Sequence, residues 1–348
     1  MHAKSPSPFC RARASLLILA TLGAFAYIVL KGFISIDVGD SESSSAALSH
    51  IQTQSIIINP LIKDAKDVVA CQRFLETNGT ESNGVWSWHD FINSGNVGPS
   101  SAGTPTQKAD KILVAQTSGF NAYYKNMMAI TSDINRAYSR RWGNDFVTFE
   151  GILLGCLGSH SSFNKIGIIQ EAIDRHYDAL LLLDADAMVV DLDMPLRSVL
   201  PLAGTDTLLT GHGKQKCEND PKCVRTINNG VMALNLRHPK MASLLSRWRE
   251  LSMEKLVKIA AGKTTDMVAS DQQWLREAYR TLFTVPEQKA YLNYTDGAFK
   301  YSQGTFIKHF IRSESEKSNT TYFVESDERM DDIRRSVSET TQRFASYF

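Results

Sequence analysis

Two aspartates follow directly on an apolar run in the middle of the chain. The run Ala179–Leu183 has the sequence ALLLL, and Asp184 and Asp186 come next, separated only by an alanine. Carboxylates spaced in this way at the end of a strand can reach one hard divalent cation, because Mg²⁺ and Mn²⁺ prefer oxygen ligands. Such an ion can act as a Lewis acid on the phosphate groups of a substrate. The pair predicts a metal site, with a solvated polar loop as the alternative.

A histidine near the C-terminus is the candidate for a third ligand. His309 lies in the segment GTFIKHF, residues 304–310. A neutral imidazole beside two carboxylates would leave coordination positions open for phosphate oxygens. The alternative is a histidine with no ligand role. A second D-x-D, Asp191 and Asp193, lies next to Pro195 and is typical of a surface turn. The cations that could neutralise a diphosphate are Lys300, Lys308 and Arg312.

The segments that must position these residues alternate between strand and helix patterns. We expect strands at Lys111–Gln116, Asp145–Phe149 and Ala179–Leu183, and helices at Ala122–Arg141 and Asn164–His176. This alternation predicts an α/β fold with a mostly parallel sheet flanked by helices. In such sheets ligands bind at the carboxyl ends of the strands, which is where the first D-x-D falls.

Composition narrows the class of protein. The chain has 348 residues, of which 43% are hydrophobic and 22% charged, an ordinary balance for a globular protein. The formal net charge of +1 excludes a strongly basic protein that binds nucleic acid through its whole surface. An anionic substrate must therefore be recognised at a local site.

The N-terminus has the pattern of a membrane anchor. Lys4, Arg11 and Arg13 precede the uncharged run Ala14–Leu30, which spans about 25 Å at about 1.5 Å per residue. Basic residues before the span keep the N-terminus cytosolic, so we expect a single-pass type II protein. A signal peptide cleaved after small residues such as Ala24 and Ala26 is the alternative.

The composition divides the chain into five parts. They are a cytosolic tail (1–13), a transmembrane signal anchor (14–36), a polar stem (37–109), the main folded domain (110–312) and a polar C-terminal extension (313–348). Export is consistent with three N-x-[S/T] sequons, at Asn78, Asn293 and Asn319. It also permits disulfides, for which Cys217 with Cys223, and Cys71 with Cys156, are the candidates; a zinc site is the alternative for the first pair.

Residues 163–200 resemble the metal-site region of glycosyltransferase family 34, which includes fungal galactosyl- and mannosyltransferases and plant xyloglucan xylosyltransferases. The shared pattern is an aromatic-x-Lys segment, here Phe163-Asn164-Lys165, then a helix, an apolar strand and D-x-D-A. Residues 226–237 (TINNGVMALNLR) resemble the family's N-x-G strand, with Asn228 or Asn229 and Gly230 in the matching positions.

The segment SDQQ, residues 270–273, resembles the D-D-Q start of a later helix in the family. Asp271 and Gln272 match, whereas Ser270 replaces the first aspartate. The Gly-Cys that follows the late histidine in the family is missing after His309. The sequence departs from the family pattern at these two places.

The resemblance implies a GT-A catalytic domain (Rossmann-like) in a type II Golgi or ER membrane protein. The enzyme would transfer a hexose or pentose, with retention, from a UDP- or GDP-linked sugar to a glycan or glycoprotein acceptor, using Mn²⁺ or Mg²⁺. By family position, Asp184, Asp186 and His309 hold the metal, Asp271 and Gln272 are catalytic, and the substrate is bound by Lys165, Asn228, Asn229 and Gly230. We expect no nucleic-acid partner, and a homo- or hetero-oligomer is possible. The alternatives are a glycogenin-like retaining enzyme and a non-catalytic lumenal scaffold.

Overall fold

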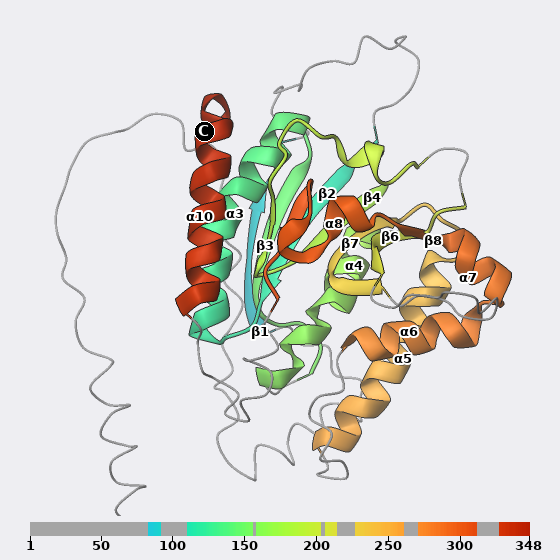
Figure 1. Ribbon diagram of the computed structural model, residues 1–348. Helices are drawn as coiled ribbons and strands as arrows, with labels where there is room; N and C mark the ends of the chain where they lie inside the picture. Colours follow the sequence, from blue (N-terminus) through green and yellow to red (C-terminus); the bar gives the residue numbers. More distant parts are fainter. Residues whose placement is uncertain are drawn as a thin grey trace, which may run out of the picture. The chain divides into compact units, whose positions relative to one another are not determined.

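A seven-stranded sheet forms the centre of the fold in the computed structural model (Figure 1). The structure describes residues 83–91, 110–155, 158–202, 206–213, 227–260, 271–311 and 327–348. The strands are β1 Asn83–His89, β2 Ile112–Ser118, β3 Asp145–Ile152, β4 Ala179–Asp184, β5 Ala187–Val189, β6 Leu209–Gly213, β7 Ile227–Asn235, β8 Leu292–Tyr294 and β9 Ile307–His309. The helices are α3 Ala122–Trp142, α4 Asn164–Asp174, α5 Met241–Ala260, α6 Asp271–Leu282, α7 Val285–Tyr291, α8 Asp296–Phe299 and α10 Asp327–Arg343.

The sheet is mixed, with most strands in one direction. Its order is β1-β3-β2-β4-β7-β6-β8, and β5 pairs with β9 in a separate two-stranded ribbon. β3, β2, β4, β6 and β8 run the same way, whereas β1 and β7 run against them. The prediction of an α/β fold with a mostly parallel sheet is confirmed at this level. The strands at 111–116, 145–149 and 179–183 are all present, each within a few residues of the predicted bounds.

The uninterrupted apolar sequence of β4 follows from burial on both faces of the sheet. Leu180 and Leu182 point into one hydrophobic core, and Leu181 and Leu183 point into the other. Successive side chains of a strand alternate between faces, so a strand covered on both sides must be apolar throughout. The first polar side chain of β4 is Asp184, at the carboxyl end, where the cover ends.

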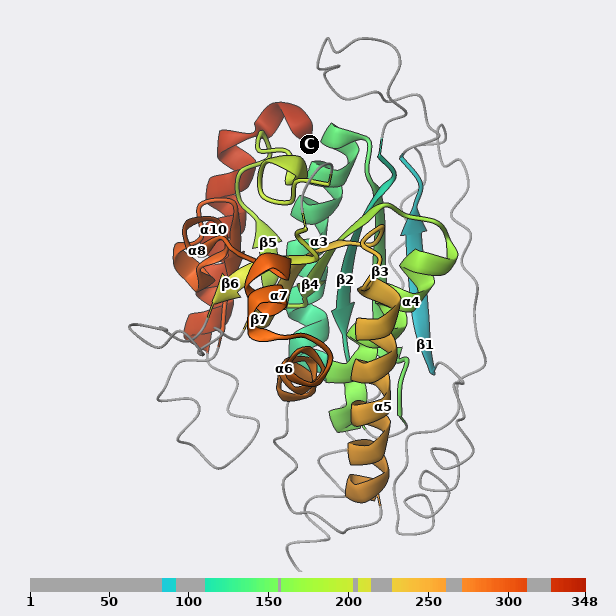
Figure 2. The same ribbon diagram turned by 90° about the vertical axis from the view of Figure 1, so that its right-hand side faces the viewer.

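Helices cover both faces of the sheet (Figure 2). α4, α5 and α6 contribute to one core, and α3 and α10 contribute to the other. α3 begins where the Asn121 side chain accepts a hydrogen bond from Tyr123 N at 2.8 Å. It ends at Gly143, whose φ of 64° is the left-handed conformation that glycine adopts without strain.

Two elements outside residues 110–312 take part in this fold. β1, inside the segment assigned to the stem, adds an antiparallel edge strand next to β3. α10, inside the polar C-terminal extension, packs against α3 and buries Met330 and Ile333. We expected neither contribution, because the sequence of an edge strand or of a highly charged helix gives little indication of what it packs against.

Several sequence predictions concern residues that the structure does not describe. The anchor at 14–36 is among them, as are all five cysteines and the sequons at Asn78 and Asn319. Among the helices of the described residues, none has the length and apolar character to span a bilayer. Asn293 is described, and its amide nitrogen donates to Val199 O at 3.2 Å and to Thr210 Oγ1 at 3.4 Å. A glycan at Asn293 would replace one of the two N–H groups of this nitrogen, so at least one of these bonds would be lost.

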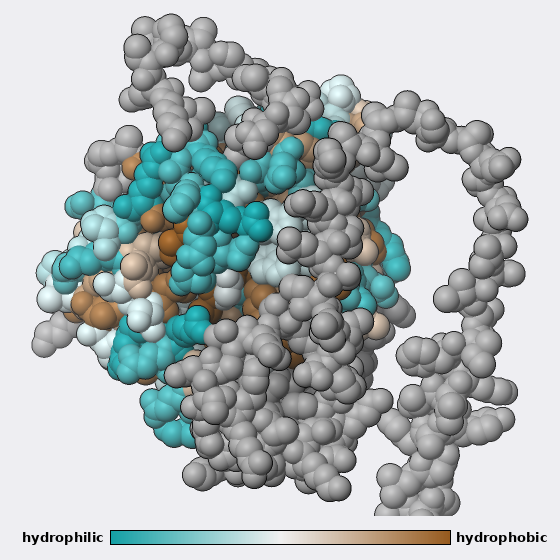
Figure 3. All heavy atoms as spheres, turned by 180° about the vertical axis from the view of Figure 1, so that it is seen from behind, coloured by the Kyte–Doolittle hydropathy of each residue, from teal (hydrophilic) through white to brown (hydrophobic). Residues whose placement is uncertain are grey.

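The described surface carries few large apolar side chains. Only Val85, Leu282 and Phe348 are both large, hydrophobic and exposed among the residues that the structure describes. On the face shown in Figure 3 the visible coloured atoms are mostly hydrophilic, with smaller hydrophobic areas between them.

Candidate metal site

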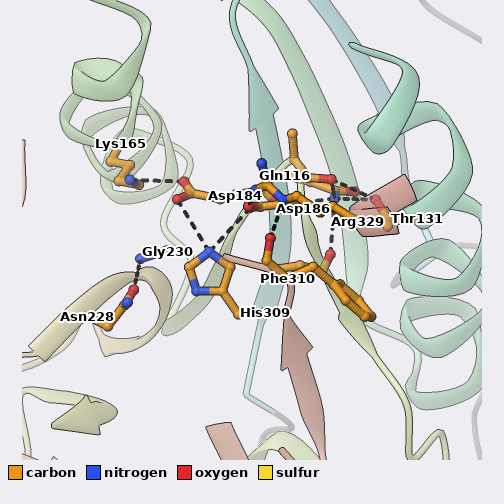
Figure 4. Close-up of polar contacts among 12 residues, drawn as sticks. Gln116, Thr131, Lys165, Asp184, Asp186, Asn228, Gly230, His309, Phe310 and Arg329 are labelled. Carbon is orange, nitrogen blue, oxygen red and sulfur yellow. Dashed lines mark hydrogen bonds and ion pairs between the residues drawn. The ribbon is translucent and has the colours of Figure 1, made fainter. Parts of the chain in front are cut away.

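The turn after β4 and the ribbon β5–β9 bring the two aspartates and the histidine together. Ala187 of β5 pairs with His309 of β9, and Phe310 N donates to Asp186 O at 2.9 Å. β9 therefore lies alongside the D-x-D turn, although more than a hundred residues separate the two in sequence. The three predicted metal ligands lie on these adjoining segments (Figure 4).

The ligand atoms of this trio lie close enough for one ion. One oxygen each of Asp184 and Asp186 and one imidazole nitrogen of His309 lie within 4.8 Å of one another. His309 Nε2 is 3.3 Å from Asp186 Oδ1 and 4.0 Å from Asp184 Oδ2. Asp186 and His309 are buried, and Asp184 is partly exposed. Two carboxylate oxygens and one imidazole nitrogen suit a hard or borderline divalent cation, so this group could hold Mn²⁺ or Mg²⁺.

Gly230 lets β7 pass directly beside the trio. A Cβ at this position would lie 2.1 Å from His309 Cε1, 2.6 Å from Nε2 and 2.8 Å from Asp184 Oδ2. No side chain fits without displacing two of the three candidate ligands. The peptide nitrogen of Gly230 donates to Asn228 Oδ1 at 2.9 Å, which holds this stretch of β7 in place. The glycine is thus explained by the close approach of the backbone to the site.

Lys165 joins the D-x-D to a second group of predicted residues. Its ammonium donates to Asp184 Oδ1 and to Asp271 Oδ2, each at 2.9 Å. The Asn229 amide donates to the same Asp271 oxygen at 2.5 Å. The buried Trp248 indole donates to Asp271 O at 3.1 Å and fixes the start of α6. Residues predicted from three separate motifs therefore form one connected polar cluster.

Burial and paired charges act together on the ionisable groups of the cluster. Burial raises the pKa of Asp184 above its ordinary value, although Lys165 opposes that shift. Burial would also raise the pKa of Asp186, but His309 and Arg329 outweigh it and hold that pKa below the usual range. Burial would lower the pKa of Lys165, and the carboxylates of Asp184 and Asp271 reverse this and raise it.

A buried amide network that the sequence did not predict fixes the backbone of the D-x-D turn. Gln116 Nε2 donates to the carbonyl oxygens of Asp184 at 3.2 Å, Ala185 at 3.3 Å and Ala187 at 3.2 Å. Asn135 Nδ2 donates to Gln116 Oε1 at 3.1 Å, and Asn135 Oδ1 accepts from Val189 N at 2.9 Å. Gln116 directly follows the apolar run of β2, and Asn135 lies at helical spacing among buried positions of α3; an amide at each of these core positions is the signal that could have found them.

Arg329 is the second contributor that the sequence did not predict. It comes from α10, and its guanidinium donates to the Asp186 carboxylate and to Phe310 O. Its side chain is only 6% exposed. The guanidinium carbon lies 5.5 Å from the ring centroid of Tyr124 and 6.0 Å from that of Tyr123. No sequence signal marks it, because it is one of several arginines in a charged helix.

The other predicted residues lie outside the trio. Gln272 is half-buried in the first turn of α6, and within the described part of the chain no hydrogen bond or ion pair joins it to the cluster. Lys308 Nζ points toward α10 and donates to Ser336 Oγ at 3.2 Å. Lys300 is exposed, and Arg312 is not among the described residues. Asp193 is exposed and accepts from Tyr347 OH at 2.6 Å, as expected for a surface turn.

No protein-family model matches the sequence, and no curated protein does. Among solved structures, the chain is similar to a glycosyltransferase involved in the glycosylation of the major capsid of PBCV-1. The identity is 16% and the TM-score 0.44, over 65% of this chain and 98% of that one. It is also similar to the glycosyltransferase GlyE of Streptococcus pneumoniae TIGR4, with 16% identity and a TM-score of 0.38, over 68% of this chain and 64% of that one.

A further similar structure is the bifunctional glycosyltransferase WbbM, with 12% identity and a TM-score of 0.38. That match covers 69% of this chain and 52% of the other. The chain thus spans less than two thirds of GlyE and about half of WbbM. Similarity this distant does not assign an activity, so the functional conclusion depends on the site.

Proposed function

We propose that this protein is a metal-dependent glycosyltransferase that transfers a hexose or pentose from a nucleotide-diphosphate sugar to a glycan or glycoprotein acceptor, with retention. The observation that carries the proposal is the trio of Asp184, Asp186 and His309 at the carboxyl end of β4. It lies where α/β sheets bind ligands. The resemblance of the flanking motifs to glycosyltransferase family 34 supports the same reaction class.

The donor set of the trio fits a diphosphate substrate. Three protein ligands leave coordination positions open, and hard cations commonly fill such positions with phosphate oxygens. A bound Mn²⁺ or Mg²⁺ would neutralise charge on the departing nucleoside diphosphate. The protein contributes the fixed geometry: the Gln116 network holds the turn, and Gly230 keeps the space beside His309 clear of a side chain.

On the sugar side, we propose that Asp271 binds a hydroxyl group and does not attack the sugar. One of its oxygens, Oδ2, accepts hydrogen bonds from both Lys165 and Asn229. A carboxylate whose charge is matched by a buried ammonium 2.9 Å away is a weak nucleophile. Retention would then proceed by a front-face route, with electrostatic stabilisation of the leaving group as the main contribution.

The test is donor turnover by the full-length protein in detergent. UDP- and GDP-linked glucose, galactose, mannose and xylose are offered with Mn²⁺ or with EDTA, and nucleotide release is measured. We expect turnover of one donor, lost in EDTA and reduced at least about a hundredfold in Asp186→Ala. Turnover that persists in EDTA would contradict the metal-dependent mechanism. No turnover, together with no metal-dependent nucleotide binding, would favour a non-catalytic lumenal scaffold.

We further propose that residues 14–36 anchor the protein in the Golgi or ER membrane with the catalytic domain in the lumen. The basic residues before the uncharged run support this orientation. Protease protection in sealed microsomes tests it. Protection of the C-terminal part, lost on adding detergent, is the expected result, and cleavage without detergent would contradict it.

A further inference from the structure

The two aspartates of the D-x-D each have a basic partner, and the two partners lie on opposite sides. Lys165 of α4 donates to Asp184 Oδ1, and Arg329 of α10 donates to Asp186 Oδ2. The remaining oxygens, Asp184 Oδ2 and Asp186 Oδ1, face His309 Nε2 at 4.0 and 3.3 Å. Figure 4 shows the lysine on one side of the cluster and the arginine on the other. Each carboxylate therefore presents one defined oxygen to the metal site.

Arg329 contacts both of the segments that carry the candidate metal ligands. It donates to the Asp186 carboxylate and also to the carbonyl of Phe310, the residue after His309. Phe310 N in turn donates to Asp186 O. One guanidinium from the C-terminal helix thus ties the D-x-D turn to the strand that carries the histidine.

We propose that Arg329 is the internal counter-cation of Asp186: it keeps the carboxylate oriented with Oδ1 toward His309 and compensates its buried charge when no metal is bound. Both side chains are 6% exposed, so Asp186 without Arg329 would be a buried charge whose one remaining ion-pair partner among the described residues is His309. Leaving one charge of a buried pair alone is strongly destabilising. α10, outside the motif-bearing region, would then be a required part of the site. The role of Arg329 at a metal site rests on the proposed metal-dependent activity. The ion pair between Arg329 and Asp186 does not depend on that activity.

The first part of the test is a double-mutant cycle in EDTA with the full-length protein. Arg329→Gln, Asp186→Asn and the double variant are compared with the wild type by thermal unfolding. We expect Arg329→Gln to lower the Tm by about 10 °C. The loss of Tm in the double variant should be smaller than the sum of the losses in the two single variants. The matched control is Arg335→Gln on the same helix, whose partner Asp332 is exposed, with an expected loss below about 2 °C.

The second part adds Mn²⁺ alone, without nucleotide. A divalent ion replaces the missing positive charge beside Asp186, so we expect Mn²⁺ to raise the Tm of Arg329→Gln by more than it raises that of the wild type. Arg329→Lys restores a cation, so its Mn²⁺ shift in Tm should lie between those of the wild type and Arg329→Gln. This variant keeps the test valid if Arg329→Gln does not fold. Additive losses in EDTA, or a Mn²⁺ shift in Arg329→Gln no larger than in the wild type, would overturn the proposal.

This design separates the inference from the proposed function. The cycle in EDTA involves neither metal nor donor sugar, so it can succeed while donor turnover fails. In that case the ion pair would stand and the glycosyltransferase proposal would be rejected. Conversely, donor turnover together with additive Tm losses for Arg329→Gln and Asp186→Asn would support the proposed function and overturn the counter-cation proposal.

Discussion

Gly230 is the residue where an added side chain would overlap a candidate metal ligand. Because a Cβ there would lie 2.1 Å from His309 Cε1, Gly230→Ala must displace the histidine ring. We expect Mn²⁺ affinity to fall at least about tenfold and the Tm to fall by a few degrees, because the buried ring must shift to make room for the methyl group. Isothermal titration with Mn²⁺ measures this. Gly297→Ala is the control, because nothing lies within 4 Å of its added Cβ. Equal affinity in the two variants would contradict the close approach of β7.

Lys165 permits a stability prediction that does not depend on metal. Its side chain is 4% exposed between Asp184 and Asp271, so Lys165→Met leaves two carboxylates without their shared cation. We expect the free energy of unfolding in EDTA to fall by about 3–5 kcal/mol, as for other broken buried pairs.

The control for this prediction is Lys125→Met, which breaks an ion pair of similar length at the surface. Lys125 Nζ lies 2.6 Å from Glu150 Oε1, but both side chains are substantially exposed. Such pairs contribute about 0–1 kcal/mol, so the loss should be small. Urea unfolding compares the two variants, and similar losses would show that Lys165 is not the partner of a buried charge.

Residue chemistry predicted the trio, the family resemblance added Lys165 and the Asn-Asn-Gly segment, and the structure places these residues in one cluster. The two aspartates could be predicted because carboxylates at the end of a buried strand have few structural roles. Gln116, Asn135 and Arg329 were not predicted. Each makes at least one hydrogen bond to a group more than fifty residues away in sequence. Sequence patterns report local periodicity and do not show such partners.

At the scale of elements, β1 shows how a short segment can join a sheet from outside the predicted domain. Its pattern of Trp86 and Trp88 on alternate positions suits a half-buried edge strand, and the two rings stack 5.7 Å apart. Only its pairing with β3 reveals its place, because an antiparallel edge strand can be added from any distance in sequence. The predicted bounds of α3 and β4 were close, since long periodic or fully apolar segments carry a strong signal.

Docking of β1 should depend on pH through His89. Burial, with a further contribution from Arg136, lowers the pKa of His89 below its ordinary value. The unfolded chain therefore binds the proton more readily, so this contribution to stability is complete above about pH 6.5 and decreases as the pH falls below it. We expect His89→Gln to flatten the dependence of the urea midpoint on pH between 7.5 and 5.5. Parallel curves for the variant and the wild type would contradict this assignment.

At the scale of the whole chain, the candidate site depends on segments from nearly the full length of the described residues. β2 supplies Gln116 and α4 supplies Lys165, but Arg329 comes from α10, so residues 110–312 alone do not contain the whole site. The sheet brings these segments together because the carboxyl ends of β2 and β4 lie side by side.

The most direct test of the central claim is the binding of Mn²⁺ to the full-length protein by isothermal titration, with and without UDP or GDP. We expect one ion per chain in the wild type, and loss of binding in Asp184→Asn, Asp186→Asn and His309→Gln. Asp193→Asn is the matched control, because it removes a carboxylate of the second D-x-D, which lies outside the trio. Binding that is lost only in the three trio variants would establish the metal site. No binding by the wild type, or binding that survives all three substitutions, would contradict it.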